Sequence, residues 1–134
     1  MTTFGAIGIA STGLTVNRKW LDAVSDNLSN INTVRPTDEA AFQAKYVVAT
    51  AGGGPTETEG TRVAGIALGS EEGRMVFEPD HPLADEEGYV RYPDIDMSSQ
   101  MSQLIMAQRG YQASTAVVER ARATYEQALS IGRN

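Results

Sequence analysis

The 134-residue chain contains no cysteine, which excludes disulfides, thiolate metal sites and a cysteine nucleophile. It has a single histidine and no apolar run long enough to span a membrane. Positive charge is also scarce, because the chain has 11 basic and 17 acidic residues, which gives a net charge of -6. This balance argues against binding to nucleic acid or to anionic membrane surfaces, since both require a positive footprint.

The N-terminus, MTTFGAIGIASTG, lacks the basic start and the apolar core of a cleaved secretory signal. We therefore expect the protein either to stay in the cytosol or to leave it by a route that needs no cleaved leader. The absence of cysteine suits passage through an oxidising compartment.

The sequence also lacks recognisable catalytic and ligand-binding motifs. His81 follows Asp80, but no G-x-S-x-G elbow accompanies it, so we interpret it as a loop residue packed between prolines. The glycines at 52–54 lack the Gly-Lys-Ser/Thr that completes a phosphate-binding loop. The sequence thus predicts no catalytic, cofactor-binding or metal-binding residue. Four carboxylates lie near one another in the sequence, but their spacing does not match that of a calcium-binding loop. They are Asp80, Asp85, Glu86 and Glu87.

Apolar residues at each end of the chain recur in alternating steps of four and three, which places them on one face of a helix. The patterns predict a helix over residues 4–31, ended by asparagines and Pro36, and a second from the N-cap Asp96 to Ile131, ended by Gly132. The first stripe is Thr3, Ile7, Ala10, Leu14, Asn17, Leu21, Val24, Leu28 and Ile31, and the second is Met97, Met101, Leu104, Gln108, Tyr111, Thr115, Val118, Arg122, Tyr125 and Leu129.

Two such stripes predict an antiparallel coiled-coil stalk with a helical arm at 1–35 and another at 94–134. A closed hairpin would bury the polar stripe residues at a cost or leave them in water. We therefore expect neighbouring molecules to supply their missing contacts, and the ends of the monomer to become fully helical only on assembly. The polar residues concerned are Asn17, Gln108, Thr115 and Arg122.

The sequence pattern of residues 36–93, in the middle of the chain, predicts a small β-rich domain. A strand at 42–48 has Phe42, Ala44, Tyr46 and Val48 on one apolar face, and further strands are expected near 63–68 and 75–77 in the same modest sheet. Residues 55–61 are polar and predict a flexible loop, and 78–93 an ordered loop that returns to the stalk. Segment 36–96 holds 13 acidic and 4 basic residues, so the acidity lies between two nearly neutral arms.

Two stretches carry a more specific pattern: ASTGLTVNRKWLDAVSDNLSNINT at 10–33 and FEPDHPLADEEGYVRYPDIDMSSQMSQLIMAQRGYQAS at 77–114. Together they resemble the bacterial flagellar basal-body rod proteins, and in particular the proximal-rod members. Asp26 and the Val34–Pro36 run depart from the family pattern. The matching positions are Ser11, Gly13, Leu14, Leu21, Asp22, Asn27, Leu28, Ser29, Asn30, Asn32 and Thr33, followed by Pro79, His81, Pro82, Ala84, Asp85, Gly88, Tyr89, Val90, Tyr92, Pro93, Met101, Arg109 and Tyr111.

The resemblance implies a structural subunit without enzyme activity or cofactor, exported by the flagellar type III apparatus and polymerising in the periplasm as part of the drive-shaft rod. The implied partners are further copies, proximal and distal rod subunits, a rod-base adaptor, the export apparatus and surrounding ring proteins. The alternative is a cytosolic coiled-coil adaptor or export chaperone that binds a partner helix. The predicted assembly residues are Leu14, Leu21, Val24, Asn27, Leu28, Asn30, Ile31, Asn32, Met101, Leu104, Gln108, Tyr111, Val118 and Tyr125.

Overall fold

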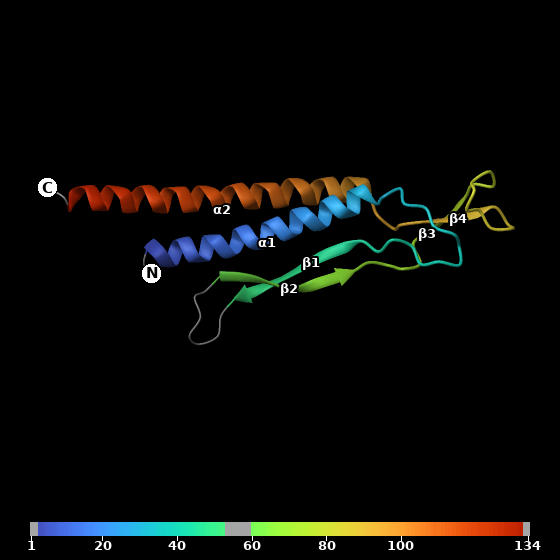
Figure 1. Cartoon of the computed structure of the whole chain (residues 1–134), viewed down its shortest axis with the longest axis horizontal. Coiled ribbons are helices and arrows are strands. Elements are labelled where there is room, and N and C mark those ends of the chain that lie inside the picture. Colours follow the sequence, from blue (N-terminus) through green and yellow to red (C-terminus); the bar gives the residue numbers. More distant parts are fainter. Residues whose placement is uncertain (1–2, 53–59, 133–134) are drawn as a thin grey trace.

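Two long helices lie side by side and antiparallel in the computed structural model, which describes residues 3–52 and 60–132. Helix α1 spans Thr3–Ser29 and α2 spans Met97–Ile131. Between them lie β1 (Lys45–Gly52), β2 (Gly60–Leu68), β3 (Arg74–Phe77) and β4 (Tyr89–Tyr92). Both chain ends lie at the same end of the stalk (Figure 1). The prediction of a mainly helical chain with a small β-rich middle is confirmed.

The helix ends follow local signals. Asp96 caps α2, because its carboxylate accepts the Ser99 N–H at 2.7 Å. At the other end the Gly132 N–H donates to the Ala128 carbonyl at 3.2 Å. Helix α1 ends at Ser29, two residues before the predicted limit, and the Asn30 amide donates to the Asp26 carbonyl just beyond it. Both caps predicted for α2 are therefore confirmed.

The strands form two separate antiparallel hairpins, β1–β2 and β3–β4. The prediction of one three-stranded sheet is wrong, because the return segment 78–93 contains β4, whose residues pair with β3 from Phe77↔Tyr89 to Arg74↔Tyr92. The first strand begins at Lys45, three residues later than expected, and continues to Gly52. Residues 55–59 of the flexible loop predicted at 55–61 lie outside the described part of the chain, and the prediction is wrong for its last two residues, because β2 begins at Gly60.

The β1–β2 hairpin runs back along α1 (Figure 1). Val47 and Ala49 of β1 line a small cavity with Val16 and Trp20 of α1. Tyr46 is 38% exposed and Val48 46%, so the apolar face predicted for this strand turns away from α1 at these two residues. Successive strand residues point to opposite faces, and the helix packs against the face that carries Val47.

A small core closes the end of the stalk where the helices meet the hairpins. Ile31, Ala44 and Ile95 are buried together, with Phe42 packed against them. Arg91 of β4 holds two loops in place at this end of the stalk. Its guanidinium donates to the Glu72 carbonyl and to the Thr37 carbonyl, each at 2.6 Å. The nearby Gly73 has a φ of +59°, a conformation that favours glycine. No helix within the described residues is both long and apolar enough to cross a membrane.

Candidate assembly surface

The structure distributes the predicted assembly residues between the inside and the outside of the stalk. Three are buried, five apolar ones are half-buried, and several on α2 face solvent. Buried are Val24, Asn27 and Ile31; half-buried are Leu14, Leu21, Leu28, Leu104 and Val118, together with Asn30; exposed are Asn32, Met101, Gln108, Tyr111 and Tyr125.

The buried face of α2 was missed by the sequence pattern. Gln100 is 2% exposed and Ala107 0%, and Ser114 and Ala121 continue their seven-residue spacing in half-buried positions. This stripe lies one residue before the predicted 101, 108, 115 and 122 positions. The seven-residue repeat of small residues was the only sequence feature that could have revealed this stripe. Alanine and serine contrast little in hydrophobicity with exposed helix residues, so hydrophobic periodicity does not detect them.

Glycines let the two helices approach closely. A Cβ added at Gly110 would lie 2.6 Å from Asn17 Oδ1, and one added at Gly13 would lie 2.9 Å from Ser114 Oγ. Trp20 Nε1 donates to Gln103 Oε1 at 3.4 Å across the same interface. The interior of the stalk is therefore built from small and polar side chains, and many of its large apolar ones remain outside.

Three of the polar stripe residues have partners in their own helix. Asn17 donates to the Gly13 carbonyl at 2.9 Å, Thr115 to the Tyr111 carbonyl at 3.0 Å, and Arg122 pairs with Glu126. Gln108 is exposed. Each of these three side chains therefore has one partner in its own helix, and further contacts from neighbouring molecules stay a prediction.

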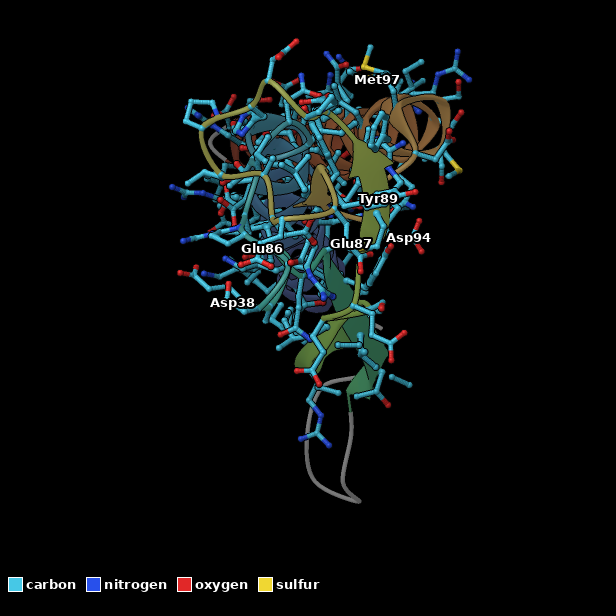
Figure 2. All side chains as sticks on the ribbon, turned by 90° about the vertical axis from the view of Figure 1, so that its right-hand side faces the viewer. Asp38, Glu86, Glu87, Tyr89, Asp94 and Met97 are labelled. Carbon is cyan, nitrogen blue, oxygen red and sulfur yellow. The ribbon has the colours of Figure 1, made fainter. Side chains whose placement is uncertain are left out.

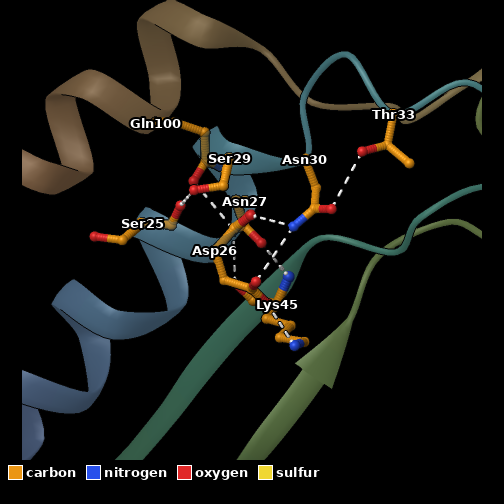
Figure 3. Close-up of polar contacts among 8 residues, drawn as sticks. All are labelled: Ser25, Asp26, Asn27, Ser29, Asn30, Thr33, Lys45 and Gln100. Carbon is orange, nitrogen blue, oxygen red and sulfur yellow. Dashed lines mark hydrogen bonds and ion pairs between the residues drawn. The ribbon is translucent and has the colours of Figure 1, made fainter.

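Asn27 joins three segments at the inner end of the stalk (Figure 3). Its amide nitrogen donates to the Lys45 carbonyl at 2.9 Å and to Gln100 Oε1 at 3.1 Å, and its oxygen accepts the Lys45 N–H at 2.8 Å. The side chain thus mimics a strand neighbour for the start of β1 while also contacting α2. Because Asn27 and Gln100 are both buried, this polar contact is sheltered from water.

The neighbouring polar residues close the end of α1 (Figure 3). Asp26 pairs with Lys45 Nζ, and the Asn30 amide donates to the Asp26 carbonyl. Thr33 Oγ1 in turn donates to Asn30 Oδ1 at 3.2 Å. The amides of Asn27 and Asn30 are therefore engaged within the chain, and their part in contacts between molecules stays a prediction.

The end opposite the chain termini is acidic, and Asp38, Glu86, Glu87 and Asp94 are spread over it (Figure 2). Asp85 organises the loop there, because its carboxylate accepts the N–H groups of Tyr89 and Glu87 and the Thr37 hydroxyl. The Tyr89 N–H is the main cause that lowers the pKa of Asp85 below its ordinary value of 3.8.

Two further side chains with polar chemistry support turns or strands at this end. His81 Nδ1 accepts the Leu83 N–H at 3.1 Å, which makes the ring part of a local turn. Partial burial, and then the hydrogen bond donated to Glu78, raise the pKa of Tyr92 above 10.0. Within residues 3–52 and 60–132, no group of three or more histidine, aspartate or glutamate side chains gathers where it could hold a metal ion.

The outward side of α2 carries large apolar side chains with nothing packed over them in the described chain. Met97 is 50% exposed, Met101 45% and Ile105 47%. The whole chain exposes 9079 Å². A compact protein of 14.4 kDa exposes about 6,800 Å². The excess indicates a surface suited to contacts with other proteins.

Comparison with known proteins connects this helical stalk to one family. Residues 7–37 match the family model described as "Flagella basal body rod protein", and residues 86–131 match "Flagellar basal body rod FlgEFG protein C-terminal". These two segments include most of α1 and all of α2.

Relatives named flagellar basal-body rod protein FlgC match over almost the whole chain. The one from Yersinia enterocolitica is 34% identical over 99% of this chain and 100% of its own length. The one from Escherichia coli O6:H1 is 31% identical with the same coverage, and the one from Borreliella burgdorferi is 28% identical over 98% of each chain. The chain therefore belongs to the family of flagellar basal-body rod proteins and is a structural component of the flagellar rod.

Proposed function

We propose that this chain is a subunit of the proximal rod, that it is exported by the flagellar type III apparatus, and that it polymerises through its terminal helices. The observation that carries the proposal is the uncovered apolar side of α2, where Met97, Met101 and Ile105 face solvent. Because each side chain is already about half buried, covering one completely between subunits stabilises the assembly by about half of the full burial value, or about 0.7 to 1.5 kcal/mol. A rod in the periplasm is the environment in which copies can cover each other's helices.

The excess of exposed surface supports several neighbours for each subunit. It amounts to about 2,200 Å², whereas a standard interface buries about 800 Å² of each partner. One closed dimer contact of standard size would leave most of it uncovered. This comparison favours a polymer, in which each subunit contacts copies on more than one side.

The proposed functional parts follow the chain. The arms 1–35 and 94–134 form the axial stalk, packed in the rod as a coiled coil, and residues 36–93 form the middle domain. The predicted assembly residues on both arms contact neighbours in the rod. Their proposed partners are further copies, the adjoining proximal and distal rod subunits and the rod-base adaptor, while the middle region lies toward the surrounding rings.

Deletion of the gene, with the unmutated copy restored as the control, tests the proposal. Electron microscopy of isolated basal bodies should show rings without a rod, and cells should lose motility. Intact flagella in the deletion strain would overturn the proposal. If the protein instead stays in the cytosol and co-purifies with an exported client, the adaptor or chaperone function is correct.

A pair of charge substitutions in α1 tests the role of the helical arms. Leu21 is half-buried and belongs to the predicted assembly set, whereas Ser25 is exposed in the next turn. Leu21→Asp should abolish rod assembly and motility without abolishing synthesis, and Ser25→Asp, which adds the same charge to the same helix, should leave both intact. Circular dichroism of the two purified variants checks that helix content is comparable. Equal motility of the two strains would contradict the role given to Leu21.

A further inference from the structure

The stalk carries an apolar groove and, elsewhere on α2, a ridge of exposed apolar side chains. The groove has a volume of about 460 Å³ and lies between α1, α2 and the start of β2. Its helical walls are made of small or short side chains, and no charged residue lines it. The lining residues from the helices include Ala6, Ile9, Ala10, Ala113, Ser114 and Val117.

The ridge consists of Met97, Met101 and Ile105, spaced four residues apart on α2 and each about half exposed. Four-residue spacing places these side chains in one row along a helix surface. Two of them are methionines, whose unbranched side chains adapt to irregular apolar gaps. A row of long apolar side chains fits a groove walled mostly by alanine, glycine and serine, because small residues leave room for them.

The positions of these two surfaces decide which kind of contact they make. Met101 and Val117 are sixteen residues apart on one helix, which corresponds to about 160° around its axis and about 24 Å along it. The ridge and the groove wall therefore lie on opposite flanks of α2. A two-fold dimer needs both surfaces on the same side, so that each copy fills the other's groove. Surfaces on opposite flanks generate an open row of copies instead.

We propose that the ridge of one copy docks into the groove of a second copy of this chain, and that repetition of this contact builds a staggered lateral row. The inference rests on the proposed function, because it assumes that copies polymerise through their helices. A second copy is the fitting occupant, since ridge and groove belong to the same chain, both are uncharged, and the surplus of exposed surface exceeds what one standard contact covers. Neighbouring stalks lie parallel and offset by about one such step of 24 Å.

Cysteine crosslinking tests the contact directly, because the natural chain has no cysteine. The double variant Met101→Cys/Val117→Cys should give a ladder of disulfide-linked multimers after mild oxidation of assembled protein. Each single variant alone should stay monomeric on a non-reducing gel, and an equal mixture of the two should give dimers only. These three patterns together identify a contact between two different surfaces.

The matched control is the double variant Met101→Cys/Gln112→Cys. Both positions are exposed, as in the test pair, but the two cysteines lie on the same flank of α2. Eleven residues correspond to about 20° around the helix. This variant should give no ladder. If Met101→Cys/Val117→Cys does not support motility under reducing conditions, Met97→Cys/Ala113→Cys tests the same contact, because it keeps the sixteen-residue separation.

The outcomes separate this inference from the proposed function. Rods that assemble without the ladder in either pair would overturn the docking contact and leave the rod function standing. Doubly linked dimers without larger species would show a closed two-fold contact, and crosslinks to a protein of another mass would show a different partner; both overturn the inference. Intact flagella in the deletion strain would overturn the proposed function itself.

Discussion

The side-chain amide of Asn27 in α1 lies 3.1 Å from Gln100 Oε1 in α2, and both residues are almost completely buried. Asn27 also exchanges two hydrogen bonds with the backbone of Lys45 at the start of β1. One side chain of α1 thus contacts both α2 and the start of the hairpin that lies along α1. A buried polar contact of this kind favours one register over alternatives in which its groups would be unpaired.

Replacement of Asn27 should therefore destabilise the chain strongly. Asn27→Ala leaves the Lys45 N–H and the Gln100 amide without their partner, and we expect a loss of about 3 kcal/mol in the free energy of unfolding. Urea unfolding followed by circular dichroism measures it. Asn32→Ala, at an exposed position three residues after Ser29, is the control and should change stability by less than about 0.5 kcal/mol. Equal effects would contradict the role of Asn27.

A double-mutant cycle tests the direct coupling of the two amides. Asn27→Ala, Gln100→Ala and the double variant should show an interaction energy of about 1 kcal/mol, because the residues share a buried hydrogen bond. Additive effects would mean that Gln100 is buried without contributing through Asn27.

Gly73 should tolerate no side chain. Its φ of +59° is unfavourable for other residues, and an added Cβ would collide with the Tyr92 carbonyl. Gly73→Ala should cost at least about 2 kcal/mol in thermal or urea unfolding. Gly65→Ala is the matched control, because nothing lies within 4 Å of its added Cβ. It should be neutral, and a comparable loss at Gly65 would show that the measured cost is not specific to the turn at Gly73.

Asp85 should make stability depend on pH in the acid range. Its pKa is lowered in the folded chain, so its contribution is present above the ordinary value of 3.8 and is lost as the pH falls through the lowered folded value. Asp85→Asn should remove part of the fall in melting temperature on acidification, relative to the unmutated chain. Glu86→Gln, at the adjacent exposed position, serves as the control. An unchanged acid slope in Asp85→Asn would contradict this assignment.

The isolated monomer should be less helical than the assembled subunit. The last turns of α2 beyond Tyr125 are exposed, including Leu129 at 53% and Ile131 at 76%, and helices without packing are marginally stable. Circular dichroism of dilute protein should therefore show less helix than the 27 and 35 residues of α1 and α2, with a gain on assembly. The single tryptophan, Trp20, bonded to Gln103 across the stalk, reports in its emission whether the two helices are closed. Full and cooperative helix content in the monomer would contradict the prediction.

The sequence by itself determined the features that depend on local interactions. The two helices, the Asp96 cap and the Gly132 end follow from periodicity and from side chains that bond to backbone within a few residues. The asparagines after Leu28 also predicted the end of α1, and the Asn30 side-chain amide does donate to the Asp26 carbonyl there. The motif pattern around them, together with the Pro79–Pro93 run, also predicted the family.

Only the tertiary structure decided which faces meet. The inner stripe of α2 contains Gln100 and Ala107 because the helices approach closely at Gly13 and Gly110, and small residues give no hydrophobic signal from which to predict this. The pairing of β3 with β4 and the packing of Val47 against α1 depend on contacts between distant segments. A strand pattern states that two faces exist, but the surface packed against it determines which one is buried.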